Sequence, residues 1–156
     1  MTIRDRLFPR QADNRFGGYH VALWLLGLFI ALKLVMGLNS ILNTRSVAAG
    51  ADGIALDSFG TAAAREVLTL FALTSLGQLT LALVALTILI RYRAMVPFIY
   101  LVLLGEMLAR RLIVQSYALP RTETTSAGWY VNMGLLILLS LGLALSLIQT
   151  RSREPA

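Results

Sequence analysis

Four long runs of apolar residues limit what this chain can fold into more than any other feature of its sequence. They span roughly residues 19–42, 67–90, 94–114 and 129–149. A helix that crosses a bilayer needs about 20 mainly apolar residues. Stretches such as Leu-Thr-Leu-Ala-Leu-Val-Ala-Leu are apolar on nearly every side, as contact with lipid requires. The sequence therefore predicts an all-α fold, an integral membrane antiparallel four-helix bundle.

The composition supports a membrane protein and excludes several kinds of site. Hydrophobic residues make up 57% of the 156 residues and charged residues 14%, whereas a soluble domain has roughly 45–50% and about 25%. The chain has no cysteine, which excludes disulfides and cysteine-ligated metals. Its single histidine, His20, argues against a zinc or haem site. We therefore expect no metal and no cofactor.

The arginines indicate how the chain is oriented. Positively charged flanks stay on the cytoplasmic side of a membrane helix, and arginines flank the apolar runs instead of forming the single basic stripe typical of nucleic-acid binding. We predict a bacterial inner (cytoplasmic) membrane protein with a cytoplasmic segment 1–18, a transmembrane domain 19–149 and a cytoplasmic tail 150–156. The arginines on the inner side are Arg4, Arg6, Arg10, Arg15, Arg91, Arg93, Arg151 and Arg153.

The connections between the runs agree with a bundle. The segment Arg-Tyr-Arg predicts a tight turn between the second and third helices, with Pro97 in the first turn of the third, so those two helices should be antiparallel neighbours. Residues 43–65 are predicted to form a long outer loop. Gly27, Gly77, Gly105 and Gly142 are candidates for close helix contacts.

A signal peptide is the alternative for the first run, because Ser-Val-Ala-Ala-Gly-Ala after it resembles a cleavage site. The apolar part of the run is longer than the usual 7–15 residues of such a peptide. It also ends well before those alanines. Both points favour a retained helix.

Charged and polar residues inside the runs gather at one depth. The stretch Gly-Glu-Met-Leu-Ala-Arg-Arg-Leu-Ile-Val-Gln, residues 105–115, brings three charges into an otherwise apolar segment. At about 1.5 Å per residue, Lys33 and Glu106 lie about 20 Å from the inner boundary and Gln78 about 18 Å. The sequence thus predicts a polar layer in the outer half of the membrane, which also includes Arg110, Asn132 and Thr74.

These charges are expected to face inward and pair, because a lone charge near the bilayer centre costs at least about 2.5 kcal/mol. Lys33 with Glu106 is the expected pair, and Arg110 lies one turn beyond Glu106 on the same face. Arg111 points elsewhere and is expected to snorkel to the outer headgroups. Two roles stay open for the set. One is structural, either charge pairing that fixes helix register or snorkelling of Lys33, which is only a couple of turns from the outer interface. The other is a site for a ligand, proton or partner.

No sequence motif predicts catalysis. The patterns HExxH, GxSxG, Walker A, GxGxxG and CxxC are all absent, and the internal repeats typical of transporters are absent too. Asp52 and Asp57 in the outer loop are two carboxylates that calcium would accept, but turn formation and helix capping explain them more simply.

The middle of the chain resembles a known group of proteins. The stretch AREVLTLFALTSLGQLTLALVALTILIRYRAMVPFIYLVLLGEMLARRLI, residues 64–113, is similar to small bacterial four-helix membrane proteins of the DoxX-like type. The shared features are an arginine ahead of a Gly/Leu-rich helix, a short basic turn and a following helix with late charges. Some of those proteins are associated with quinone-linked or redox complexes, so the resemblance implies an accessory subunit. It carries over no catalytic residue.

The sequence therefore favours a small non-enzymatic integral membrane protein, an accessory or assembly subunit of a larger inner-membrane complex. Its expected partners are the lipid bilayer and another integral membrane protein or a second copy of itself, with no nucleic acid. The alternative is a membrane-embedded binder of a quinone, a lipid headgroup or a small anion. The pocket for such a ligand would lie in the outer half and be lined by Lys33, Gln78, Glu106, Arg110 and Asn132.

Overall fold

The computed structural model describes residues 3–117 and 127–148, and within those ranges the chain is built from helices without a β-strand. The predicted all-α class is confirmed for this part of the chain. The four long helices are α2 (His20–Leu42), α4 (Thr61–Arg91), α5 (Val96–Ser116) and α6 (Ala127–Leu147). Short segments connect or precede them: α1 (Ile3–Leu7), α3 (Thr44–Ser46), the π-helical turn η1 (Val47–Ala51), and the 3₁₀ turns η2 (Leu56–Ser58) and η3 (Arg93–Met95).

Three of these helices are long and apolar enough to cross a membrane, namely His20–Leu42, Thr61–Arg91 and Gly128–Leu147. This property indicates a membrane protein. Helix α5 has 21 residues, a sufficient length, but it carries Glu106, Arg110 and Arg111. These charges lie within the apolar length of α5, whereas the charges of α4, namely Arg65, Glu66 and Arg91, lie near its two ends.

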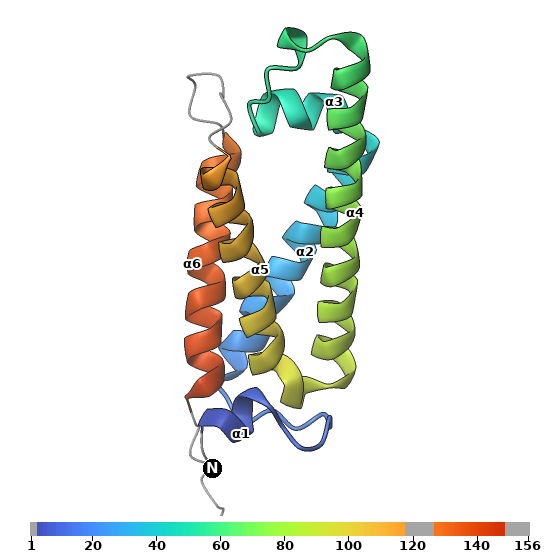
Figure 1. The fold of residues 1–156 in the computed structure, drawn as a ribbon. Helices are drawn as coiled ribbons and strands as arrows, with labels where there is room; N and C mark the ends of the chain where they lie inside the picture. The colour runs from blue at the N-terminus through green and yellow to red at the C-terminus, as the bar shows by residue number, and fades with distance from the viewer. Residues whose placement is uncertain (1–2, 118–126, 149–156) are drawn as a thin grey trace, which may run out of the picture.

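The long helices pack mainly as three pairs: α2 with α4, α2 with α6, and α5 with α6. Helices α4 and α5 are joined by the tight turn η3, and Pro97 lies at the start of α5, as predicted. Away from that turn the two helices diverge (Figure 1) and make few direct contacts. The prediction that they pack as neighbours therefore holds only near their connection.

The segment between the first two long helices is more structured than a loop. It contains α3, η1 and η2, and Gly53 takes a positive φ of 66° in the turn between the last two. Helix α4 begins at Thr61, six residues before the predicted start. Residues 62–64 are alanines, the strongest helix former, so the helix extends beyond its apolar run.

One close contact holds three long helices together. Tyr100 of α5 is fully buried, and its hydroxyl donates a hydrogen bond of 2.6 Å to the carbonyl oxygen of Ala22 in α2. Its ring lies so close to Gly142 of α6 that a Cβ there would overlap it. Gly142 is thus a close-contact glycine, as predicted, whereas Gly77 and Gly105 have no neighbouring atom within 4 Å of such a Cβ.

Candidate functional site

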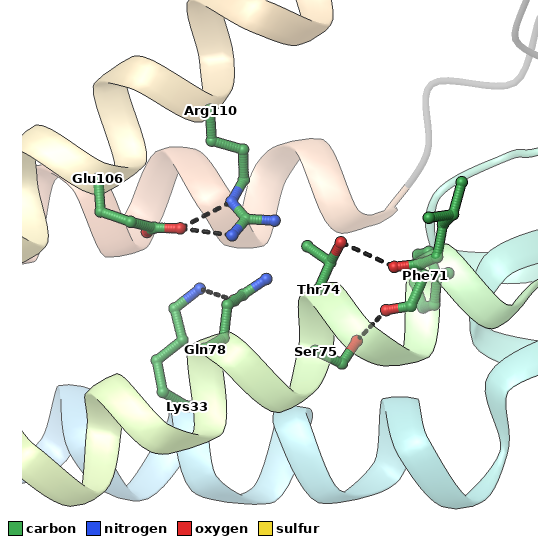
Figure 2. A network of polar contacts seen from close by, with 8 residues as sticks. Lys33, Phe71, Thr74, Ser75, Gln78, Glu106 and Arg110 are labelled. Carbon is green, nitrogen blue, oxygen red and sulfur yellow. Dashed lines mark hydrogen bonds and ion pairs between the residues drawn. The ribbon is translucent and has the colours of Figure 1, made fainter. Parts of the chain in front are cut away.

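Lys33 is a charged residue buried between apolar helices. It lies on α2 with 7% of its surface exposed, and its Nζ donates a hydrogen bond of 3.0 Å to Oε1 of Gln78 on α4. Phe29, one turn earlier on α2, places its ring centroid 5.9 Å from the same Nζ. The ammonium group is therefore held by a neutral amide and an aromatic face, as Figure 2 shows for the amide.

Glu106 of α5 lies opposite Lys33 and forms an ion pair with Arg110, which was also predicted to line the pocket but lies outside the lining. Arg110 donates to Oε1 of Glu106 through Nε, at 3.0 Å, and through Nη2. The residues are four apart, a spacing that places them on one helix face. The side chains of Glu106 and Arg110 are 29% and 37% exposed. This pair is thus half-buried, at the margin of the bundle and not in its centre.

The prediction that Lys33 and Glu106 form an ion pair is wrong. Among the described residues, Glu106 forms its ion pair with Arg110, and Lys33 bonds to Gln78. The physical reason is reach. An arginine one turn away on the same helix contacts a carboxylate without crossing the bundle, whereas Lys33 meets the amide of the adjacent helix α4 first.

Lys33, Gln78 and Glu106 nevertheless line one cavity between α2, α4 and α5. Its empty volume is about 230 Å³, which includes open space at its mouth. The enclosed part has room for about one water molecule. The apolar lining residues are Phe29, Leu81, Ala82 and Leu103.

The cavity and its margin together carry an unbalanced charge, because Arg110 beside the lining adds a second cation to Lys33. Glu106 offsets one of the two cations Lys33 and Arg110, which leaves a net charge of +1 when all three are ionised. Every fully buried side-chain nitrogen and oxygen of the described residues has a hydrogen-bond partner. Figure 2 shows the amide nitrogen of Gln78 directed away from Lys33. The site thus combines satisfied hydrogen bonds with a surplus of positive charge.

The remaining polar residues of the predicted layer lie outside this cavity. Asn132 is exposed on α6 and is not among the residues that line the cavity. Thr74 is exposed and donates to the carbonyl oxygen of Leu70 in its own helix, at 2.8 Å. Arg111 reaches Met133 of α6, with Nη1 3.8 Å from Sδ, so it contacts a neighbouring helix.

The carboxylates between α2 and α4 do not gather into a cluster of metal ligands within the described residues. Asp57 forms an exposed ion pair of 3.4 Å with Arg45, and residues 3–117 and 127–148 contain no group of three potential metal ligands. Asp52 instead lies beside the start of α6, where a Cβ on Gly128 would be 3.0 Å from its Oδ1. Asp52 therefore lies next to the N-terminal end of α6.

Comparison with protein-family models, with curated protein sequences and with solved structures finds no match to this chain. The resemblance to DoxX-like proteins stays a prediction from helix spacing.

Sequence reasoning missed two residues of this region. Phe29 looks like one more apolar residue of its run, although its spacing of four from Lys33 could have placed its ring beside the ammonium. Ser75 is buried on α4 and donates to the carbonyl oxygen of Phe71 at 2.9 Å. No motif marks either residue.

Proposed function

We propose that this chain is a non-enzymatic integral membrane protein that crosses the bilayer with α2, α4, α5 and α6 and binds a negatively charged oxygen group between α4 and α5. Three of the helices are apolar enough to span. Helix α5 packs with α6 and projects Tyr100 to α2, which supports its place beside them in the membrane. The arginines of the N-terminal segment support a cytoplasmic placement of the N-terminus.

The single observation that carries the proposed binding is the position of Lys33. It is a buried cation that lies in a cavity and has a neutral amide as its hydrogen-bond partner. Ionisable residues within membrane segments are costly and usually serve function. A negatively charged ligand oxygen would offset the net charge that Glu106 leaves unbalanced.

The groups around the cavity suit an oxygen ligand. Lys33 has further N–H donors, the Gln78 amide nitrogen is directed away from Lys33, and Arg110 lies at the exposed margin (Figure 2). A ligand would approach from that margin, where α4 and α5 diverge. The space admits about one small group, so a phosphate or carboxylate would require these two helices to separate further.

Two sources supply such a group, an anionic lipid headgroup and a small free anion. Native mass spectrometry of the protein purified in a neutral detergent distinguishes them by the mass retained. We expect wild-type protein to keep a bound anion or anionic lipid that Lys33→Met loses. Arg65→Met, which removes a cation from an exposed position, should keep it. Elution of both variants as single folded species in gel filtration is the folding control.

Other outcomes of this measurement would contradict the proposed binding. Retention of the same mass by wild type and Lys33→Met, or no retained mass in either, overturns it. A quinone identified by its mass would change the ligand class to a neutral carbonyl compound. A partner protein retained at fixed stoichiometry by both the wild type and Lys33→Met would instead support a role as accessory subunit of a larger membrane complex. The chain would then dock through its lipid-facing helix surfaces.

A further inference from the structure

Residues 3–19, here called the N-terminal strap, cover the end of the bundle where α2 begins and α6 ends. Figure 1 shows α1 lying across that end. The backbone N–H of Tyr19 donates to Leu145 at 3.2 Å. The side chain of Arg6 donates to the carbonyl oxygen of Leu147. Two hydrogen bonds, one from the backbone and one from a side chain, therefore fix the strap to the end of α6.

The strap is also fixed to the other side of this end. The backbone N–H of Ala94, in the turn between α4 and α5, donates to the backbone carbonyl oxygen of Asp13 at 3.1 Å. The rings of Phe8 and Phe98 pack with centroids 5.7 Å apart, and Phe16 packs against the hydrophobic core. These contacts hold the charged residues of the strap and of the α4–α5 turn on one surface.

That surface is strongly basic. Six arginines and two aspartates lie on the strap and the adjoining turn, a net charge of +4 for these residues. Two apolar side chains accompany the charges, because Ile3 is 66% exposed and Phe8 is 56% exposed. The exposed arginines are Arg4, Arg10, Arg15, Arg91 and Arg93.

We propose that this basic surface binds anionic phospholipid headgroups, with Ile3 and Phe8 in contact with the outermost part of the acyl layer. The surface lies where apolar helix α2 begins, where apolar helix α6 ends and where α4 turns into α5, which is the level of the headgroups in a spanning bundle. Basic residues beside a membrane attract anionic lipid, and exposed apolar side chains add to this attraction. The inference rests on the proposed membrane placement and is independent of the cavity at Lys33.

Two tryptophans allow the preference for anionic over neutral lipid to be measured separately at each end of the bundle. Trp24 is 81% exposed, one turn inside α2 from the strap, and Trp129 lies in the first turn of α6 at the opposite end. In phosphatidylcholine bilayers, quenching by brominated phosphatidylglycerol is compared with quenching by brominated phosphatidylcholine. The variant Trp129→Phe keeps Trp24 and reports on the strap end, and the variant Trp24→Phe keeps Trp129 and reports on the opposite end.

We expect phosphatidylglycerol to associate preferentially at Trp24, and Arg4→Gln with Arg10→Gln to lower that preference by about five-fold for each arginine that contacts a headgroup. Added salt should lower it as well. The matched control, Arg45→Gln with Arg65→Gln, removes two exposed arginines from the opposite end and should leave quenching at Trp24 unchanged. Lys33→Met should also leave it unchanged, which separates this inference from the cavity ligand.

Equal quenching of Trp24 by the two lipids in the wild-type protein would overturn the inference. So would a preference for phosphatidylglycerol that survives loss of Arg4, Arg10, Arg91 and Arg93 together. If those substitutions instead release a copurifying acidic protein and leave the lipid preference intact, the surface binds protein and the lipid assignment is wrong. Thermal melting in detergent verifies that each variant is folded.

Discussion

The contact around Tyr100 and the cavity around Lys33 show two ways of placing a polar group beside helices α2 and α5, with α6 as the third helix at Tyr100 and α4 as the third at Lys33. Tyr100 is fully buried, its ring fills the space left by Gly142, and its hydroxyl has a backbone partner. Lys33 is also buried, but it lies beside a cavity and the nearby ion pair is half-exposed. A large ring with one hydroxyl is compatible with close packing, whereas three charges leave the helices apart.

The largest effect is expected at Gly142. Gly142→Leu places a side chain in the space of the Tyr100 ring, and overpacking of a core typically costs about 1–3 kcal/mol. Because the contact joins α2, α5 and α6, we expect a loss near the upper end of that range, about 3 kcal/mol. The free energy of unfolding in mixed detergent micelles, titrated with sodium dodecyl sulfate, measures it.

Gly105→Ala is the matched control, since a Cβ at that position meets no atom within 4 Å. It should leave stability unchanged or raise it by up to about 1 kcal/mol, because alanine is the better helix former. Equal losses for the two glycine variants would show that the Tyr100 contact is not what distinguishes this region.

A smaller effect is expected when only the hydroxyl of that contact is removed. Tyr100→Phe keeps the ring against Gly142 and deletes the hydrogen bond to Ala22. A typical net contribution of such a bond is about 1 kcal/mol, so the variant should lose about that much. An unchanged free energy of unfolding would mean that ring packing alone holds α5 to α2.

The sequence predicts the helical fold well because apolar run length is a local property. The starts and ends of α2 and α6 follow their runs closely. The start of α4 does not, because alanines 62–64 extend the helix by propensity and not by hydrophobicity. The divergence of α4 and α5 could not be predicted from their short turn, since side-chain volumes farther along determine how closely the two helices pack.

The level of the candidate site along the helices could be predicted from the sequence, but the pairs that its side chains form could not. Counting residues along helices places Lys33, Gln78 and Glu106 at one level, and all three line one cavity. The rotation of each helix about its axis decides which side chains meet, and this rotation cannot be predicted from the length of an apolar run. Asn132 therefore shares the predicted level but lies exposed on α6, and Arg110 takes the carboxylate that was assigned to Lys33.

Lys33→Met tests the cavity side of the comparison. Replacing a buried charge that lacks an ionic partner by an apolar side chain of similar size is often neutral or stabilising. We expect a free energy of unfolding equal to or up to about 1 kcal/mol above that of the wild type, together with loss of the bound anion in native mass spectrometry. A clear loss of stability would show that the ammonium group is a structural element of the bundle.

The smallest effect is expected for the ion pair on α5, because its members are half-exposed and four residues apart. Pairs of this kind contribute about 0.2–0.5 kcal/mol on a helix surface. In a double-mutant cycle, Glu106→Gln and Arg110→Gln should show a coupling free energy of about 0.5 kcal/mol, while Glu106→Gln and Lys33→Met should be nearly additive. Such a pattern would assign the carboxylate to Arg110 and leave Lys33 free for a ligand. A stronger coupling of Glu106 to Lys33 than to Arg110 would instead place both residues in one structural pair and would remove the unbalanced charge on which the proposed binding rests.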